Sequence, residues 1–195
     1  MQAYKSTTNF EVKWELKRKL LHLPGLLVPF LYAWQPHALL VALALISALY
    51  YFSELARLKK GKSFPLLGYL GEKLSRPSSH LDLAPIYLAV GLGISLLFLP
   101  FKAALVGTLL VCFCDAVAAV TGIQWGRRRI FVLKKTYLGS FAFFISAFLS
   151  LLLLLGWPGA LVTALVATLV ETFSIEGIDN LLLPILGGLV AQLFL

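Results

Sequence analysis

The sequence predicts an all-α polytopic membrane protein, a helical bundle with about seven transmembrane helices. Of its 195 residues, 59% are hydrophobic and only 13% are charged, whereas soluble domains have about 45–50% and about 25%. The apolar residues form continuous runs without the alternation of a transmembrane β-strand. Because a span needs roughly 20 apolar residues, about seven spans use the whole chain. We therefore expect one integral-membrane domain over residues 1–195 and exclude a soluble enzyme and a disordered chain.

Seven apolar segments are the expected helices. They run over residues 20–35, 38–53, 83–100, 103–122, 138–156, 159–175 and 180–195. Tight turns are expected at Gln35-Pro36-His37, around Pro100 and at Gly156-Trp157-Pro158-Gly159, since Pro and Gly interrupt helices. The first and sixth segments are short for a full span, which favours tilted or broken helices there.

The basic residues predict how the chain is oriented. Every Lys and Arg except Lys102 lies in the N-terminal segment 1–19 or in the basic loops 54–82 and 123–137. By the positive-inside rule the N-terminus is cytoplasmic and the C-terminus is outside. The acidic residues fall on or near the same side. We therefore expect a multi-pass protein of the cell membrane whose active site faces the cytoplasm.

Carboxylates near the membrane are the sharpest functional signal. Asp115 lies inside the fourth apolar segment, where a charge costs about 2.5–3.5 kcal/mol. It is either a metal ligand or catalytic carboxylate in a hydrated cavity, or a structural polar group between helices. Glu171 and Asp179 lie on the same cytoplasmic rim, although Asp179 could also be a helix N-cap. Three carboxylates together favour Mg²⁺, which binds carboxylates and substrate phosphates.

Small and basic residues surround this rim. Gly122 and Gly126 continue a small-residue face from Asp115, which serves either close helix packing or the approach of a nucleotide or lipid headgroup. The basic loop ends at Lys134-Lys135, just before a predicted helix. Lysines at a helix N-terminus form an anion site, although a basic loop can also be a topology signal alone.

Four ordered segments resemble the dolichol kinase/phytol kinase family of membrane lipid kinases, which is related to the phosphatidate cytidylyltransferases. They are Glu15-Leu16-Lys17-Arg18-Lys19-Leu20-Leu21-His22; Asp115-Ala116-Val117-Ala118-Ala119-Val120-Thr121-Gly122 with Gly126; Lys134-Lys135-Thr136-Tyr137-Leu138-Gly139-Ser140; and Glu171 with Asp179-Asn180 and Pro184.

The resemblance implies CTP-dependent phosphorylation of a membrane lipid alcohol such as phytol, a polyprenol or dolichol, with Mg²⁺ as cofactor. Asp115, Asp179 and Glu171 would be catalytic, with Asp115 and Asp179 holding the metal. Arg18, Lys19 and His22 would contact the lipid headgroup. Nucleotide and phosphate binding would fall to a larger set: Lys134, Lys135, Thr136, Gly139, Ser140, Arg127, Arg128, Gly122, Gly126 and Asn180.

Three alternatives stay open. Diacylglycerol could be the kinase acceptor, or the protein could be a cytidylyltransferase that forms a CDP-lipid, although the K-D-x-x-x-x-x-P-G-H-G-G type run of such enzymes is missing. A transporter or scaffold is disfavoured by the one-sided charges and the lack of inverted segments. The expected partners are CTP, the lipid alcohol and the bilayer, with no nucleic acid. The small-residue face is compatible with a homodimer.

Overall fold

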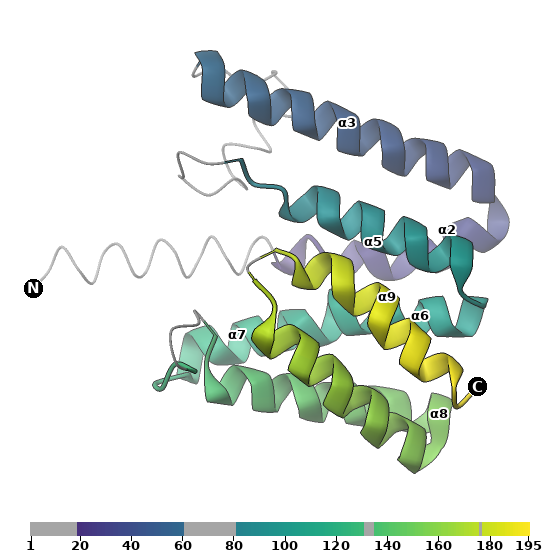
Figure 1. Cartoon of the computed structure of the whole chain (residues 1–195), viewed down its shortest axis with the longest axis vertical. Coiled ribbons are helices and arrows are strands. Elements are labelled where there is room, and N and C mark those ends of the chain that lie inside the picture. Colours follow the sequence, from purple (N-terminus) through teal and green to yellow (C-terminus); the bar gives the residue numbers. More distant parts are fainter. Residues whose placement is uncertain (1–18, 61–80, 131–134, 176) are drawn as a thin grey trace, which may run out of the picture.

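The computed structural model describes residues 19–60, 81–130, 135–175 and 177–195 as a helical bundle (Figure 1). Within these ranges the all-α prediction is confirmed, and the only β feature is an isolated bridge between Arg129 and Thr136. In chain order the elements are the 3₁₀-helix η1 (Leu23–Leu27), α2 (Val28–Trp34), α3 (Pro36–Lys60), α5 (Ala84–Phe98), α6 (Phe101–Leu109), the π-helix η2 (Leu110–Cys114), α7 (Asp115–Trp125), α8 (Tyr137–Phe173) and α9 (Asp179–Gln192).

Three helical stretches in the described part of the chain are long and apolar enough to cross a membrane. They are Pro36–Leu58, Phe101–Trp125 and Tyr137–Phe173. The seven predicted apolar segments all fall on helices, but Leu23–Trp34, Ala84–Phe98 and α9 are shorter than the roughly 20 residues of a full span. The chain is therefore a membrane protein, and the prediction of seven full spans is not supported.

The long helix α8 consists of two antiparallel arms that meet at Gly156 (Figure 1). In a straight helix Ser140 and Thr172 would be about 48 Å apart, yet their hydroxyl oxygens lie 2.8 Å from each other. Gly156 has a φ of 66°, which a residue without a Cβ adopts at little cost. The predicted turn at Gly156-Trp157-Pro158-Gly159 is therefore confirmed.

The chain runs back and forth between the two ends of the bundle. Figure 1 shows the end of α3, the start of α5, the end of α7, both ends of α8 and the start of α9 at the left-hand end. The α2–α3 and α5–α6 connections and the turn at Gly156 lie at the opposite end. The described loops that carry charged residues therefore meet at one end, which we call the charged end. Lys102, at the start of α6, lies away from it.

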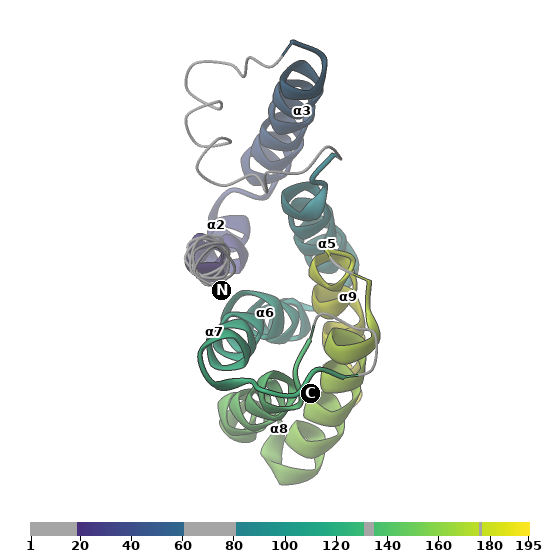
Figure 2. The ribbon, with the colours of Figure 1, turned by 90° about the vertical axis from the view of Figure 1, so that its left-hand side faces the viewer.

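The stretch formed by α6, η2 and α7 is the centre of the bundle. Seen along the helices, it is flanked by α2, α8 and α9, and α3 lies at the periphery (Figure 2). Accordingly, 67% of an 18-residue apolar part of Phe101–Trp125 is buried inside the protein, against 11% of the corresponding part of Pro36–Leu58. The central stretch therefore packs against protein, while most of α3 is free to face lipid.

Close packing between α6 and α9 gives a first testable prediction. A Cβ on Gly107 would overlap the backbone of Pro184, lying 2.8 Å from its carbonyl carbon. We expect Gly107→Ala to lower the free energy of unfolding by about 1–3 kcal/mol, because backbone cannot move aside as a flexible side chain can. The measurement is thermal unfolding in detergent. The matched control is Gly93→Ala on α5, where a Cβ meets nothing within 4 Å. Equal stability of the two variants would contradict the packing.

Candidate active site

Asp115 follows directly on the π-helical turn Leu110–Cys114. π-helical turns are rare and frequent at functional sites. The carboxylate is 3% exposed and forms an ion pair with the ammonium of Lys19, which is equally buried. His22, also buried, interacts electrostatically with Asp115. Asp115 is thus a paired charge that joins the central helix to the segment before η1.

A second charged group lies around Lys135. Its Nζ is 2.9 Å from Oε1 of Glu171 and 3.0 Å from Oδ2 of Asp179, and it also donates to the carbonyl oxygen of Glu171. Burial alone would lower the pKa of the Lys135 ammonium, but the carboxylates of Asp179, Glu171 and Asp115 outweigh burial and raise the pKa to about 12. Lys135 is therefore fully charged at physiological pH, and all three predicted carboxylates act on it.

Backbone structure holds Lys135 in this position. Ile130 N donates to the carbonyl oxygen of Lys135 at 2.9 Å, and Tyr137 N donates to that of Arg128 at 3.3 Å. Thr136 is the N-cap of α8, and its Oγ1 accepts from Gly139 N at 3.1 Å. An N-cap side chain satisfies a backbone N–H that the helix leaves free. Thr136 was predicted to bind phosphate, and in the structure its hydroxyl has a structural role as the cap of α8.

Two hydroxyl groups extend the Lys135 group across the arms of α8. Ser140 Oγ donates to Oε2 of Glu171 at 3.2 Å. Thr172 Oγ1 lies 2.8 Å from Ser140 Oγ and 3.2 Å from the same Glu171 oxygen. Sequence reasoning identified Ser140 and Glu171 but missed Thr172, whose one signal was its place directly after Glu171 in an apolar segment.

Asn180 completes the site at the start of α9. The residue is 1% exposed, and its Nδ2 donates to the carbonyl oxygen of Ala84 at 3.2 Å. Its Oδ1 is buried and has no hydrogen-bond partner among the described residues. A buried oxygen without a partner costs about 1–3 kcal/mol. Such an oxygen suits a metal ion or a hydroxyl donor, and its neighbour is Asp179, whose Oδ1 accepts from Asn180 N at 3.0 Å.

The oxygen donors of the site match the ligand preference of Mg²⁺. The candidates are the carboxylates of Asp115 and Asp179 and the unpaired Oδ1 of Asn180, and Mg²⁺ takes one or two carboxylates together with substrate phosphates. In this structure lysine ammonium groups occupy both carboxylates. Over the described ranges no three His, Cys, Asp or Glu side chains are grouped to hold a metal ion. The metal ligands Asp115 and Asp179 stay a prediction.

The predicted glycines lie where α7 packs against the start of α8. A Cβ on Gly122 would be 2.8 Å from Thr136 Oγ1, and one on Gly139 would be 3.0 Å from the carbonyl oxygen of Ala118. A Cβ on Gly126 would also meet Thr136. This agrees with the packing interpretation of the small-residue face. Because that face packs inside the chain, it gives no support for a homodimer.

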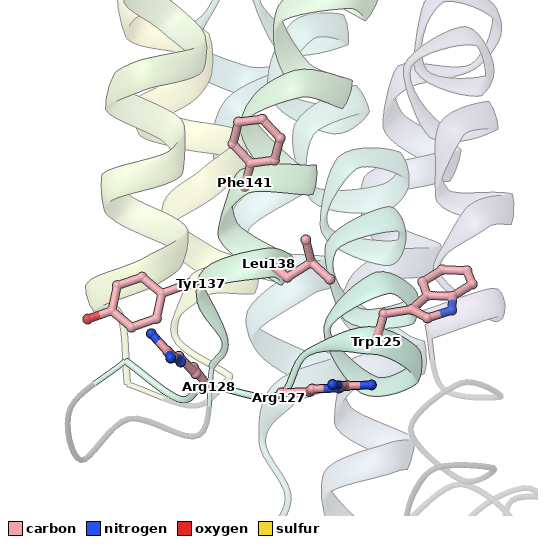
Figure 3. A pocket seen from close by; sticks show the side chains of 6 residues that line it. All are labelled: Trp125, Arg127, Arg128, Tyr137, Leu138 and Phe141. Atoms are coloured by element: carbon pink, nitrogen blue, oxygen red, sulfur yellow. The ribbon is translucent and has the colours of Figure 1, made fainter.

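The two arginines of the predicted phosphate site lie elsewhere. Arg127 and Arg128 line a surface pocket with Trp125, Tyr137, Leu138 and Phe141 (Figure 3), and neither contacts the carboxylates through a hydrogen bond or ion pair within the described ranges. Lys19 and His22, predicted to contact a lipid headgroup, lie at Asp115. Arg18 and Lys134 fall outside the described residues.

Comparison with known proteins gives two partial similarities. The chain is 34% identical to a phytol kinase of Synechocystis sp. over 118 residues, which cover 53% of this chain and 50% of that protein. It is 40% identical over 102 residues to an uncharacterized protein of Methanocaldococcus jannaschii, covering 51% of this chain and 52% of the relative. The chain thus matches about half the length of these curated relatives. No family model and no solved structure matches the chain.

Proposed function

We propose that this protein is a membrane lipid-alcohol kinase that transfers the γ-phosphoryl group of CTP, with Mg²⁺, to an isoprenoid alcohol such as phytol or a polyprenol. The observation that carries the proposal is a group of charged side chains toward the charged end of the bundle: the buried carboxylates Asp115, Glu171 and Asp179, the buried Lys19 and the half-buried Lys135. The similarity to a phytol kinase supports the kinase class. Phosphoryl transfer depends mainly on positioning and charge neutralisation, which such a group can supply.

The reaction assigns a role to each side chain. The lipid hydroxyl oxygen forms a bond to the γ-phosphorus, the bond from that phosphorus to the β–γ bridging oxygen breaks, and CDP leaves. Asp179 or Glu171 accepts the hydroxyl proton. Lys135 exchanges its carboxylate partners for phosphate oxygens, and Ser140 donates to a phosphate oxygen. Oδ1 of Asn180, which has no partner among the described residues, would help to hold the metal ion. When bound at Asp115 and Asp179, Mg²⁺ would neutralise charge that develops on the phosphates.

We also propose that the charged end faces the cytoplasm of the cell, with the N-terminus on that side and the C-terminus outside. The basic residues at this end support the orientation through the positive-inside rule. The lipid tail would lie among the apolar helices with its hydroxyl at the interface, near Lys135. This arrangement lets a water-soluble nucleotide and a membrane-bound alcohol meet at one surface.

Product analysis by mass spectrometry tests the proposal. Purified protein in detergent receives Mg²⁺, either CTP or ATP, and a pool of phytol, polyprenol, diacylglycerol and phosphatidate. We expect CDP and the monophosphate of an isoprenoid alcohol, with ATP a poorer donor. The variant Lys102→Gln removes a positive charge far from the site and should therefore retain full turnover.

Other products would overturn specific parts of the proposal. Pyrophosphate with a CDP-lipid would replace the kinase by a cytidylyltransferase. New phosphatidate that carries the acyl chains of the added diacylglycerol would make diacylglycerol the acceptor. No product from any combination would overturn the enzyme assignment.

A further inference from the structure

A pocket on the outer face of the α7–α8 pair lies apart from the carboxylate group. It has a volume of about 400 Å³ and is lined by two arginines, three aromatic residues and a leucine: Trp125, Arg127, Arg128, Tyr137, Leu138 and Phe141. In Figure 3 the aromatic side chains and Leu138 lie along the helix ends, and both arginines lie at the loop end of the pocket. The pocket therefore combines an apolar wall with a cationic rim.

The positive charge of the rim is not balanced within the protein. Neither Arg127 nor Arg128 has an ion pair or side-chain hydrogen bond to a residue in the ranges that the structure describes, and both are exposed. Elsewhere at the charged end, by contrast, Lys19, Arg57 and Lys135 all pair with carboxylates. The two unpaired guanidinium groups lie at opposite sides of the rim, Arg127 on the side of Trp125 and Arg128 on the side of Tyr137 (Figure 3). Each can receive a phosphate group, since arginine presents several donors in a plane that matches phosphate oxygens.

The wall of the pocket indicates that the molecule bearing the phosphate has an apolar part. Trp125 and Phe141 are 63% and 60% exposed, and Leu138 is 40% exposed. These residues belong to the two apolar stretches Phe101–Trp125 and Tyr137–Phe173, which are long enough to span a membrane. Trp and Tyr concentrate at the membrane interface, where one end of the side chain is apolar and the other is hydrated.

We propose that this pocket binds an anionic phospholipid of the surrounding bilayer. Its headgroup phosphate lies at the cationic rim that Arg127 and Arg128 form, and an acyl chain runs over Leu138 and Phe141. A nucleotide fits less well, because its polar ribose would lie on apolar side chains that face lipid. This site is separate from the carboxylate group, so the inference does not depend on the proposed kinase reaction.

Native mass spectrometry of the purified protein in detergent tests the site. Phosphatidylglycerol and phosphatidylcholine with identical acyl chains are added in equal amounts. We expect the protein to retain the anionic lipid at least about fivefold more often. The double variant R127Q/R128Q should lose this preference, whereas Arg129→Gln, an exposed arginine of the same loop outside the pocket, should keep it. Phe141→Gln should reduce retention of both lipids.

Controls separate the phospholipid from other anions. Soluble glycerol phosphate, which lacks acyl chains, should not displace phosphatidylglycerol at millimolar concentration, and neither should CTP. Equal retention of the two lipids by the natural protein, or unchanged preference in R127Q/R128Q, would overturn the proposal. Displacement by glycerol phosphate would show a site for free phosphate, and displacement by CTP would assign the arginines to the nucleotide. Thermal unfolding of the variants should match that of the natural protein, because neither arginine has a partner to lose among the described residues.

Discussion

Replacing Asp115 by Asn is expected to lower kcat of the proposed kinase reaction by about 10³-fold, the size of loss when a phosphoryl-transfer enzyme loses one charge-stabilising group. Asn has the same shape as Asp but lacks the negative charge that would hold a metal ion. The measurement is lipid phosphate formation by purified protein at saturating CTP.

Asp115 also forms a buried ion pair with Lys19. Loss of activity in Asp115→Asn therefore does not by itself distinguish a catalytic role of Asp115 from a structural one. In Asp115→Asn the ammonium of Lys19 stays buried without its partner, and breaking a buried pair in this way costs about 3–5 kcal/mol. The double variant K19M/D115N removes both charges and should regain most of the lost stability while staying inactive. If the double variant turned over like the natural protein, Asp115 would be only the structural partner of Lys19.

Replacing Lys135 by Met is expected to lower the stability of the protein as strongly as Asp115→Asn does. The change leaves the carboxylates of Glu171 and Asp179 next to each other without a cation. We expect a loss of about 3–5 kcal/mol in the free energy of unfolding, measured by chemical denaturation in detergent at pH 7. Lys135→Arg, which keeps the charge, should recover a large part of this loss. A Lys135→Met variant as stable as the natural protein would contradict the ion pairs.

The pH dependence of this difference has a definite sign. The pKa of Lys135 rises from 10.5 to about 12 on folding, so the folded state holds the proton more tightly. This contribution, about 2 kcal/mol, is fully present below pH 10.5 and is lost as the pH rises through about 12. The stability difference between the natural protein and Lys135→Met should therefore not vary through this lysine between about pH 6 and pH 9.

Local sequence patterns were enough to predict the helices and to identify charged residues that lie together in the structure. Apolar runs and helix-breaking residues depend on neighbouring positions, so the turns at Pro36, Pro100 and Gly156 were found correctly. Three of the predicted site residues, Lys135, Glu171 and Asp179, meet directly in the structure. Their common feature, a charge at the border of an apolar segment, is visible without knowing how the helices pack.

The missed features depend on contacts between distant parts of the chain. The partners Lys19 and Asp115 are 96 positions apart, and nothing in either segment identifies the other. Thr172 reaches Ser140 only because the arms of α8 fold back at Gly156. The described residues support three full spans where the sequence predicts about seven, since apolar composition marks a helix in a protein core as well as one in lipid.

The π-helical turn before Asp115 has a consequence for how related sequences are aligned. A π turn holds one residue more than an α turn, so Leu110–Cys114 amounts to a single-residue insertion in the central helix. Before it, Gly107 contacts α9, and after it Gly122 contacts the start of α8. Without the extra residue every later position would rotate by about 100°, and Asp115 would turn away from Lys19. A relative with an uninterrupted α-helix here is one residue shorter, and the gap in its alignment belongs within 110–114.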